Sequence, residues 1–519
     1  MSRTGSPFPF VLPPRAEAAP ATRWLYESLR TAILQGRLAL GSRLPTTREL
    51  ARQHGLARGT VVTAFENLRA EGYVNATVGS GTYVACELPE SLLVVPRAHG
   101  TREARPRLAA PPPRRLSAAA RRLTPLSSYP DGPTPAFRIG QPALDLFPTA
   151  LWAQVASRRL RMASVRQLLG CGALGHEPLR AAIAEYLVSA RGVHCTPGQV
   201  AIVSGTLEAL TIVARLLLDP GDRAAIERPG YGGAVRVLEA HGATIVPVPI
   251  DGEGLVVDPR RLKRTRLVYV TPAHQYPMGG SMSVTRRLAL LDWAYDAGAT
   301  IFEDDYDSEY RFCGPPMPAL QGLDRHGQVI FAGSFSKVLF PSLRLGYVVL
   351  PPDLVDPFAA VVSLTTRHAP LLEQAVVADF ITGGHFGRHI RRMREVYAER
   401  HSALIEGARS ELAGLLDVCD VEAGLQTVGW LPAGVDGLRV AALTESRGVE
   451  VKTVPQALEA GGTQHVLQLG FAAVDTAEIR RGVQVLGEVI RGVMARGAKA
   501  PGGRNGASGG GARLAVASQ

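Results

Sequence analysis

Hydrophobic spacing divides the chain into two modules of different character. Between residues 16 and 86 apolar positions recur at helical spacing, and a short strand-turn-strand stretch, "YVNATVGSGTYVA", ends the module. From Phe137 to about Ala495 short apolar runs alternate with helical stretches. The predicted strands of this second module are residues 200–203, 223–226, 244–247, 267–270, 300–303, 328–332 and 346–350. Short buried strands interleaved with helices favour a mostly parallel sheet covered on both faces.

The length and the segments between the modules predict a multidomain protein. A chain of 519 residues exceeds what one compact core usually holds. A stretch rich in Pro, Arg and Ala separates the modules and reads as an extended linker, and a Gly-rich tail is typical of disorder. The predicted organisation is a disordered N-terminus (1–15), a first domain (16–87), a linker (88–136), a second domain (137–495) and a disordered tail (496–519).

The positive charge of the chain lies outside the second module. The whole chain carries +11, but residues 137–495 carry −2, whereas residues 16–86 carry +3 and residues 87–136 carry +4. Lys and Arg neutralise phosphates, so this distribution favours a polyanionic partner for the N-terminal part. The +4 of the tail is equally well explained as charge that keeps a disordered segment solvated.

Composition excludes several other classes of protein. Hydrophobic residues at 46% and charged residues at 20% are typical of a globular protein, and no apolar run approaches the ~20 residues of a membrane-spanning helix. The five cysteines are scattered, odd in number and without CxxC spacing, so neither a disulfide framework nor a metal site is predicted. We expect a cytoplasmic protein.

The first module contains a helix-turn-helix pattern in "ELARQHGLARGTVVTAFENLRAEGY". Gly55 makes the bend, and the second helix is predicted to begin at about Arg58 with Val61, Ala64, Phe65 and Leu68 inward. If that helix enters a major groove, its first residues face bases. The "GSG" of the following hairpin has the small residues that allow close approach to a DNA backbone. Taken alone, this pattern also fits a plain helical hairpin.

The second module places one lysine, Lys337, in "GSFSKVLFPSLRLGY" after an apolar run. A lysine that forms a Schiff base needs a setting that lowers its pKa. Pyridoxal phosphate also needs an acid for its ring nitrogen and an anion hole for its phosphate. In "TIFEDDYDSEYRF" a strand ends at Asp304 and Tyr306, which face the same side and suit the ring nitrogen and the ring oxygen. The same acids also fit a solvated loop or a metal site.

An anion hole is offered where a predicted strand leads through Gly205 and Thr206 into an amphipathic helix. Free backbone N–H groups and the helix dipole favour an anion there. Hydroxyl donors and a charge beside the lysine come from Ser334, Ser336 and Arg344. Tyr231 has a ring that can stack on the cofactor, although a core tyrosine after a turn is as good an interpretation.

Whole segments of the chain resemble a known family. Residues 26–84 resemble the winged helix-turn-helix of GntR-type bacterial transcriptional regulators, and the order of phosphate turn, aromatic, acid, lysine and arginine resembles fold-type I aminotransferases. Together with "FRIGQPALDLFP", "EDDYDSEYRF" and "HIRRMREVYAERHSAL", these features identify the chain as similar to the MocR subfamily of GntR regulators. The implied fold is an N-terminal α+β winged helix-turn-helix joined by a linker to an α/β aminotransferase-like domain that binds pyridoxal 5'-phosphate (PLP).

The resemblance assigns roles to individual residues. Lys337 is the implied Schiff-base lysine, Asp304 the partner of the ring nitrogen and Tyr306 a ring-oxygen contact. Phosphate ligands are implied at Gly205, Thr206, Ser334, Ser336 and Arg344, pocket positions at His274 and Gln275, and DNA contacts at Arg43, Arg48, Arg58, Thr60 and Gly79. Arg58 is the residue expected to read bases.

Three positions depart from the family pattern, among them Leu207, which replaces a commoner polar residue after the phosphate turn. Gly170, in "GCGALG", stands where the family usually has a tyrosine that reaches a phosphate. In "HVLQLGFAAVD", Gln468 occupies the neighbourhood in which aminotransferases usually place an arginine that grips an α-carboxylate. A bidentate carboxylate clamp is therefore not evident, and the effector is either held differently or is not an α-amino acid.

The leading hypothesis is a DNA-binding regulator that senses a small amine, an amino acid or PLP itself through Schiff-base exchange at Lys337. The alternative is a working aminotransferase with an accessory DNA-binding head, for which the missing arginine predicts poor turnover. The resemblance implies a domain-swapped homodimer in the bacterial cytoplasm, associated with the nucleoid when bound to DNA. "SFSK" also fits the S-x-x-K string of serine β-lactamases, but the S-D-N and K-T-G partners do not occur.

Overall fold

The computed structural model describes residues 12–15, 20–77, 81–88, 114–117, 120–121, 123, 132–314, 317–454 and 465–497. The chain forms two compact units, Met1–Arg114 and Arg115–Gln519. Within the described residues no helix is both long and apolar enough to cross a membrane. Most of the predicted linker and nearly all of the predicted tail lie outside the described residues.

The first unit contains the predicted helix-turn-helix. Its helices are α1 (Ala21–Leu34), α2 (Thr47–Gln53) and α3 (Arg58–Ala70). Thr46 begins α2 with a capping box, in which its backbone N–H donates to Glu49 at 2.9 Å and its hydroxyl accepts from the Glu49 N–H at 3.3 Å. Gly55 supplies the bend with a φ of 62°. The predicted inward face of α3 is buried, so the interpretation as a helix-turn-helix is confirmed.

A small hairpin completes this unit. Strand β1 (Val74–Thr77) pairs antiparallel with β2 (Gly81–Val84). The tip of the hairpin, with the predicted DNA contact Gly79, lies outside the described residues. Leu12, in the segment predicted to be disordered, is 8% exposed and packs into the core of this unit. The structure therefore orders part of that segment, because an apolar side chain gains free energy by leaving water.

The second unit is built on an eight-stranded sheet with the order β3-β10-β9-β8-β7-β4-β5-β6. The strands are β3 (Val200–Val203), β4 (Arg223–Arg228), β5 (Thr244–Asp251), β6 (Gly254–Leu255), β7 (Thr265–Val270), β8 (Thr300–Asp305), β9 (Val329–Ser334) and β10 (Gly346–Val349). Strand β10 runs antiparallel to both neighbours and β6 runs antiparallel to β5, while the other neighbours are parallel. Every predicted strand is present within a few residues, and the mostly parallel sheet is confirmed.

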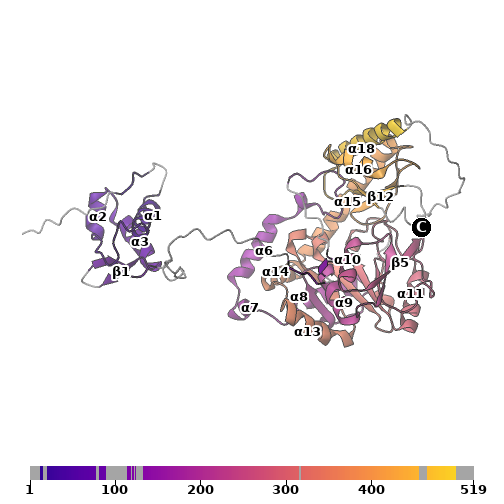
Figure 1. Cartoon of the computed structure of the whole chain (residues 1–519), viewed down its shortest axis with the longest axis horizontal. Helices are drawn as coiled ribbons and strands as arrows, with labels where there is room; N and C mark the ends of the chain where they lie inside the picture. Colours follow the sequence, from indigo (N-terminus) through magenta and orange to yellow (C-terminus); the bar gives the residue numbers. More distant parts are fainter. Residues whose placement is uncertain are drawn as a thin grey trace, which may run out of the picture. The chain divides into compact units, whose positions relative to one another are not determined.

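Helices cover both faces of this sheet. One face packs on α9 (Thr206–Leu217), α10 (Gly232–Ala240) and α13 (Val355–Thr365). The other packs on α11 (Val284–Ala297), α8 (Glu177–Arg191) and α14 (Leu371–Thr382). A further helix, α6 (Thr149–Arg161), packs beside α14, and the short helix α7 (Val165–Leu169) follows it at the margin of this unit (Figure 1).

A second, antiparallel sheet with the order β11-β12-β14-β13 was not predicted. Its strands are β11 (Asp417–Val418), β12 (Gln426–Trp430), β13 (Lys452–Thr453) and β14 (Val466–Gly470), and it lies with α15 (His385–Glu411), α16 (Gly437–Glu445) and α18 (Thr476–Gly497) (Figure 1). Ala136 and Phe137 form bridges to Val449 and Gly470. The chain that follows the predicted linker is therefore anchored to this small sheet.

Candidate functional site

Three chain segments meet at the carboxyl edge of the large sheet. Strand β9 ends at Ser334 and continues into the short helix α12 (Phe335–Val338), which carries Lys337. Strand β8 runs parallel to β9 with Asp304 opposite Ala332, and its end therefore lies at the same edge. Strand β3 points the same way, because β10 is antiparallel to both β3 and β9, and it leads through Gly205 into α9. The topology thus gathers lysine, acid and phosphate turn, as the strand order of open α/β sheets favours.

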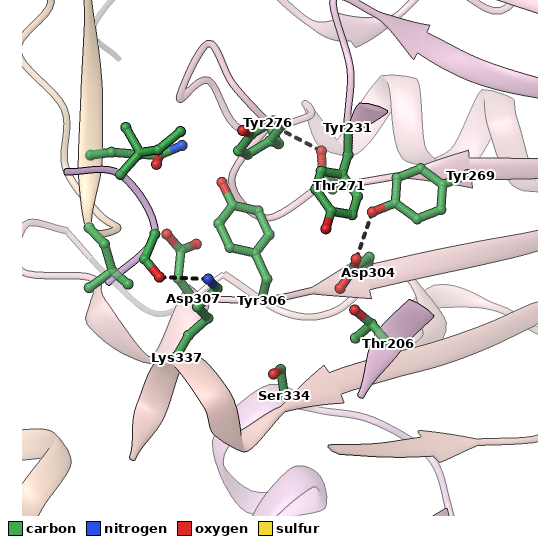
Figure 2. A pocket seen from close by; sticks show the side chains of 14 residues that line it. Thr206, Tyr231, Tyr269, Thr271, Tyr276, Asp304, Tyr306, Asp307, Ser334 and Lys337 are labelled. Atoms are coloured by element: carbon green, nitrogen blue, oxygen red, sulfur yellow. Dashed lines mark hydrogen bonds between the residues drawn. The ribbon is translucent and has the colours of Figure 1, made fainter. Parts of the chain in front are cut away.

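These segments enclose a cavity of about 170 Å³ (Figure 2). It is lined by Ile139, Gly140, Thr206, Tyr231, Tyr269, Thr271, Tyr276, Asp304, Tyr306, Asp307, Ser334, Lys337, Leu425 and Gln426. Figure 2 shows Lys337, Tyr306 and Asp304 around the same space. Lys337 and Asp304, the two residues on which the PLP hypothesis depends, therefore share one cavity.

Lys337 is held in the cavity by a backbone contact. Its Nζ donates to the carbonyl oxygen of Gly140 at 2.6 Å. The side chain keeps some surface toward the cavity but is densely surrounded by protein, and this burial lowers the pKa of Lys337 from its ordinary value. The carboxylates of Asp307 and Asp304 oppose the shift, and the charge of Arg344 adds to it. A lowered pKa favours the neutral amine that attacks a carbonyl carbon.

Asp304 has one oxygen without a partner. Its Oδ2 accepts a hydrogen bond from the Tyr269 hydroxyl at 2.6 Å, whereas its buried Oδ1 has no partner among the described residues. Burial raises the pKa of Asp304 to about 7, and the Tyr269 hydrogen bond partly opposes this rise. An unpartnered buried carboxylate oxygen is costly. A protonated ring nitrogen is a partner that would satisfy it.

Tyr306 and Asp307 are joined by a histidine behind the cavity wall. His274 Nδ1 lies 2.9 and 3.0 Å from the two carboxylate oxygens of Asp307 and 3.1 Å from the Tyr306 hydroxyl. The Nε2 of the same ring is buried without a partner among the described residues. His274 therefore fixes the two wall residues and does not itself line the cavity.

The phosphate cradle is formed by the turn before α9 and by the loop after α12. Gly205 has a φ of 139°, and a Cβ at this position would lie 3.4 Å from the Arg344 guanidinium. Among the described residues no side chain caps the N-terminus of α9, which leaves the backbone N–H groups of its first turn, beginning at Thr206, open to an anion. The Ser336 hydroxyl oxygen is buried without a partner among the described residues. These donors fit a phosphate.

The structure does not bring every predicted residue to the cavity wall. Thr206, Tyr231, Asp304, Tyr306, Ser334 and Lys337 line the cavity; Gly205, Ser336 and Arg344 are not among the lining residues. Gln275 holds its own loop, with its Nε2 donating to the carbonyl oxygens of Pro229 and Tyr276 at 2.9 and 2.7 Å. Gly170, with a φ of 124°, faces the His368 ring, which a Cβ would approach to 2.6 Å.

Several lining residues were not predicted from sequence. Tyr269 lies near the end of β7, the strand next to β8, and Thr271 directly follows that strand, so the shared strand edge was a usable signal for them. Asp307 follows Tyr306 directly and was passed over within the acidic run. Gly140 and Gln426 come from distant parts of the chain; Gly140 lies in the family-like segment "FRIGQPALDLFP", which was given no role at the cavity, and no local pattern marks Gln426.

The predicted DNA contacts are placed within the first unit. Arg43, Arg48 and Arg58 are exposed, and Thr60 is half-buried in the first turn of α3. The Arg43 side chain lies against Gly81 of the hairpin, where a Cβ would come within 2.8 Å of its Nε. Within the part of the chain that the structure describes, no side chain caps the N-terminus of α3. These three arginines are accessible to phosphates or base edges.

Several carboxyl groups near the site are buried without full compensation, and this predicts a pH dependence of stability. Burial raises the pKa of Glu227 to about 7 from an ordinary 4.5, although the Thr271 hydroxyl donates to it at 2.7 Å. A raised carboxyl pKa means that the folded state binds more protons than the unfolded state between these values. Stability is therefore lost as pH rises through this window. Between about pH 5 and about pH 8, wild type should lose on the order of 1–3 kcal/mol more than Glu227→Gln in urea denaturation.

The exposed residue Glu399 offers a control for this experiment. Glu399→Gln should leave the pH dependence of wild type in place. Equal pH slopes for wild type and Glu227→Gln would contradict the assignment.

Comparisons with known proteins agree with both units. The model for bacterial regulatory proteins of the gntR family matches residues 21–84, and the model for aminotransferase class I and II matches residues 137–486. The chain is 41% identical over 480 residues to the probable rhizopine catabolism regulatory protein MocR of Rhizobium meliloti, covering 92% of this chain and 95% of that protein. The chain belongs to the MocR subfamily of GntR-type transcriptional regulators. This MocR-type regulator binds DNA through its winged helix-turn-helix and takes pyridoxal 5'-phosphate as its cofactor.

Two further comparisons bear on this MocR-type chain. It is 30% identical over 473 residues to the pyridoxine biosynthesis transcriptional regulator PdxR of Corynebacterium glutamicum, covering 91% of this chain and 96% of that protein. The α-aminoadipate aminotransferase LysN of Thermus thermophilus, solved with N-(5'-phosphopyridoxyl)-L-leucine, matches with a TM-score of 0.64 and 30% identity. That match covers 69% of this chain and 92% of LysN.

Proposed function

We propose that this regulator senses a small primary amine that competes with Lys337 for PLP, and that occupancy of the cavity changes its binding to DNA. The observation that carries the proposal is the placement of Lys337, whose amine lies in one cavity with Asp304 and has a lowered pKa. The N-terminal unit would carry the change in DNA binding, because the gntR family model matches its residues 21–84.

The residues around the cavity have defined roles in this proposal. When bound, PLP supplies an aldehyde carbon for which the Lys337 amine and an incoming primary amine compete. Asp304 would hold the proton on the ring nitrogen, and Tyr306 would contact the ring oxygen. The phosphate would be held by Gly205, Thr206, Ser334, Ser336 and Arg344. Lys337 displaced from the cofactor would be free to donate to the Gly140 carbonyl, as its free amine does in this structure, and this would change the contacts of the cavity wall.

Binding and response are tested together by titrating PLP-loaded protein with primary amines while following visible absorbance and operator affinity. The proposal requires that an amine which shifts the absorbance also shifts the affinity for DNA. If an amine shifts the absorbance but leaves operator affinity unchanged at every concentration, the sensor role is rejected. Rapid multiple turnover with a keto acid would instead favour the aminotransferase alternative, which the absence of an arginine at Gln468 makes less favourable.

Arg58 is proposed to read bases from the start of α3. Arg58→Ala should relax sequence preference, with a loss of about 1–3 kcal/mol of discrimination at the contacted base pair. Arg48→Ala, which removes a proposed phosphate contact, should weaken binding to all sequences and lower its salt dependence. The measurement is operator affinity against single-base variants at several salt concentrations. Unchanged base preference in the Arg58 variant would refute the assignment.

A homodimer is proposed from an exposed apolar face on α6 and α7. Leu160, Met162, Val165, Leu168 and Leu169 are 60, 70, 75, 66 and 83% exposed. Clustered exposed apolar side chains mark interaction surfaces, and family resemblance makes a second copy of the chain the occupant. Two winged units per dimer, exchanged between subunits, would match a repeated or palindromic operator on the bacterial nucleoid.

A further inference from the structure

Gln426, which lines the cavity, and Gln468, beside it on the small sheet, each have a buried amide nitrogen without a normal hydrogen bond among the described residues. Gln426 is 3% exposed and Gln468 is 5% exposed. The Nε2 atom of each is buried and makes no hydrogen bond of acceptable geometry with the described residues. Leaving a buried donor unpaired costs about 1–3 kcal/mol, so two such donors in one place point to a missing partner.

Strand register places the two glutamines on the same face of the small sheet. In the antiparallel pair of β12 and β14, Gln426 stands opposite Gly470, and Val428 stands opposite Gln468. The two glutamines are thus diagonal neighbours, because residues two apart along a strand share a face. Gln426 lines the cavity that holds Lys337. Gln468 interacts with Tyr276, another lining residue, and partly opposes the rise in the pKa of that hydroxyl caused by its burial.

The charge around these amides disfavours an anionic ligand. Among the lining residues that the structure describes, Lys337 is the single cation, and Asp304 and Asp307 are both acids. Arg344 lies behind Gly205 on the phosphate side. A carboxylate buried without a cation costs several kcal/mol, and two neutral amide donors replace little of that loss.

Two cations in the neighbourhood are already paired. Arg138 precedes the lining residue Ile139 and donates through its Nε to Glu450 at 3.0 Å. Lys452 stands opposite Gln468 on β13, is half exposed, and lies 3.5 Å from the other oxygen of Glu450. Neither side chain lines the cavity.

We propose that Gln426 and Gln468 form the effector subsite of this regulator, and that the effector is a hydroxyl-bearing primary amine without a carboxylate, such as an amino alcohol or amino polyol. The inference rests on the proposed exchange at Lys337. A hydroxyl oxygen accepts from an amide N–H, and its proton can be donated to an amide oxygen, so one hydroxyl can satisfy both kinds of group. The amine of the effector engages the cofactor and its hydroxyl engages the glutamine pair.

Three amines of nearly equal size test the chemistry of this subsite. L-alaninol carries a hydroxymethyl group, L-alanine a carboxylate and 2-aminobutane an ethyl group on the same carbon frame. Each is titrated into the full-length PLP-loaded protein, with affinity measured by visible absorbance and independently by calorimetry. L-alaninol should bind about tenfold or more tightly than either of the other two, as one added hydrogen bond to a buried donor implies.

Variants test whether the two glutamines cause the preference for L-alaninol. Gln426→Leu and Gln468→Leu should each lower the affinity for L-alaninol about tenfold while leaving 2-aminobutane unchanged. Gln468→Arg should reverse the preference toward L-alanine, because a guanidinium pairs bidentately with a carboxylate. Visible absorbance of each variant before titration reports that the cofactor site is intact.

The outcomes separate failure of the subsite from failure of amine sensing. Tighter binding of L-alanine by wild type, or equal loss of all three amines in the glutamine variants, overturns the subsite while leaving exchange at Lys337 in place. Absence of binding by all three amines at their solubility limit, with the cofactor present, overturns both proposals. Equal binding of all three by wild type means that the amides do not contact the ligand, and the subsite is then rejected.

Discussion

Lys337→Ala is expected to remove the covalent attachment of PLP. Wild-type protein loaded with PLP should show a visible band and, after borohydride reduction, about one phosphopyridoxyl label per chain on the peptide that contains Lys337. The variant should show neither, because Lys337 is the single cation among the described lining residues and its amine points at the cavity-wall carbonyl of Gly140. Absorbance and peptide mass measure both effects.

The same substitution should also change the stability and the response of the protein. A ligand present at 100 times its Kd stabilises the folded state by about 2.7 kcal/mol, so PLP should raise the melting temperature of wild type much more than that of Lys337→Ala. Operator affinity of the variant should no longer respond to amines.

A matched control is available for this prediction. Lys263 is exposed and lies just before β7, at the end of the sheet opposite the cavity. Lys263→Ala should keep the band, the label and the response to amines. A full label in Lys337→Ala, or its loss in Lys263→Ala, would show that another group carries the cofactor.

Paired charges in the apolar face of α6 and α7 are expected to dissociate the proposed homodimer. The double variant Leu168→Lys, Leu169→Lys replaces two side chains that are 66 and 83% exposed in the single chain. If a second copy covers them, each lysine loses an apolar contact and gains a desolvation cost. Loss of one interface anchor typically costs about 2 kcal/mol or more, so the dissociation constant should rise at least ~30-fold.

Sedimentation or light scattering across a concentration series measures this effect. Val284→Lys, at an exposed apolar position at the start of α11, adds the same kind of charge away from the face and should leave the mass unchanged. Operator binding by the double variant should weaken at low protein concentration, because the two winged units are then no longer joined in one dimer. A double variant that keeps the mass of a dimer would place the interface elsewhere.

The sequence made the large sheet predictable because its strands are short, apolar and bounded by helices. β3 was predicted with its observed limits, and β8 was extended by only two residues beyond the prediction. The acid and the lysine could be placed for the same reason, since Asp304 lies near the end of β8 and Lys337 in the short helix that follows β9. The antiparallel small sheet escaped prediction because β11 and β13 are only two residues long. Strands this short leave no periodicity to detect.

The far wall of the cavity depends on contacts between distant residues. Gly140 touches Lys337 across 197 positions of sequence, and Gln426 reaches the same space from β12. The sequence marks Gly140 only as part of a family-like segment and does not mark Gln426, and it places neither residue at the cavity. Gln468 could be singled out only because the family pattern places an arginine there, and its unpartnered amide became visible only in the folded chain.

The bridge between Phe137 and Gly470 gives strand β14 two structural roles. Two residues before Gly470 the strand presents Gln468 to the interior, and at Gly470 it holds the stretch of polypeptide through which the second unit is tied to the first. Three residues beyond Phe137, the carbonyl of Gly140 receives the lysine amine. Chemical events in the cavity and the attachment of the segment that leads from the first unit are thereby joined along one backbone.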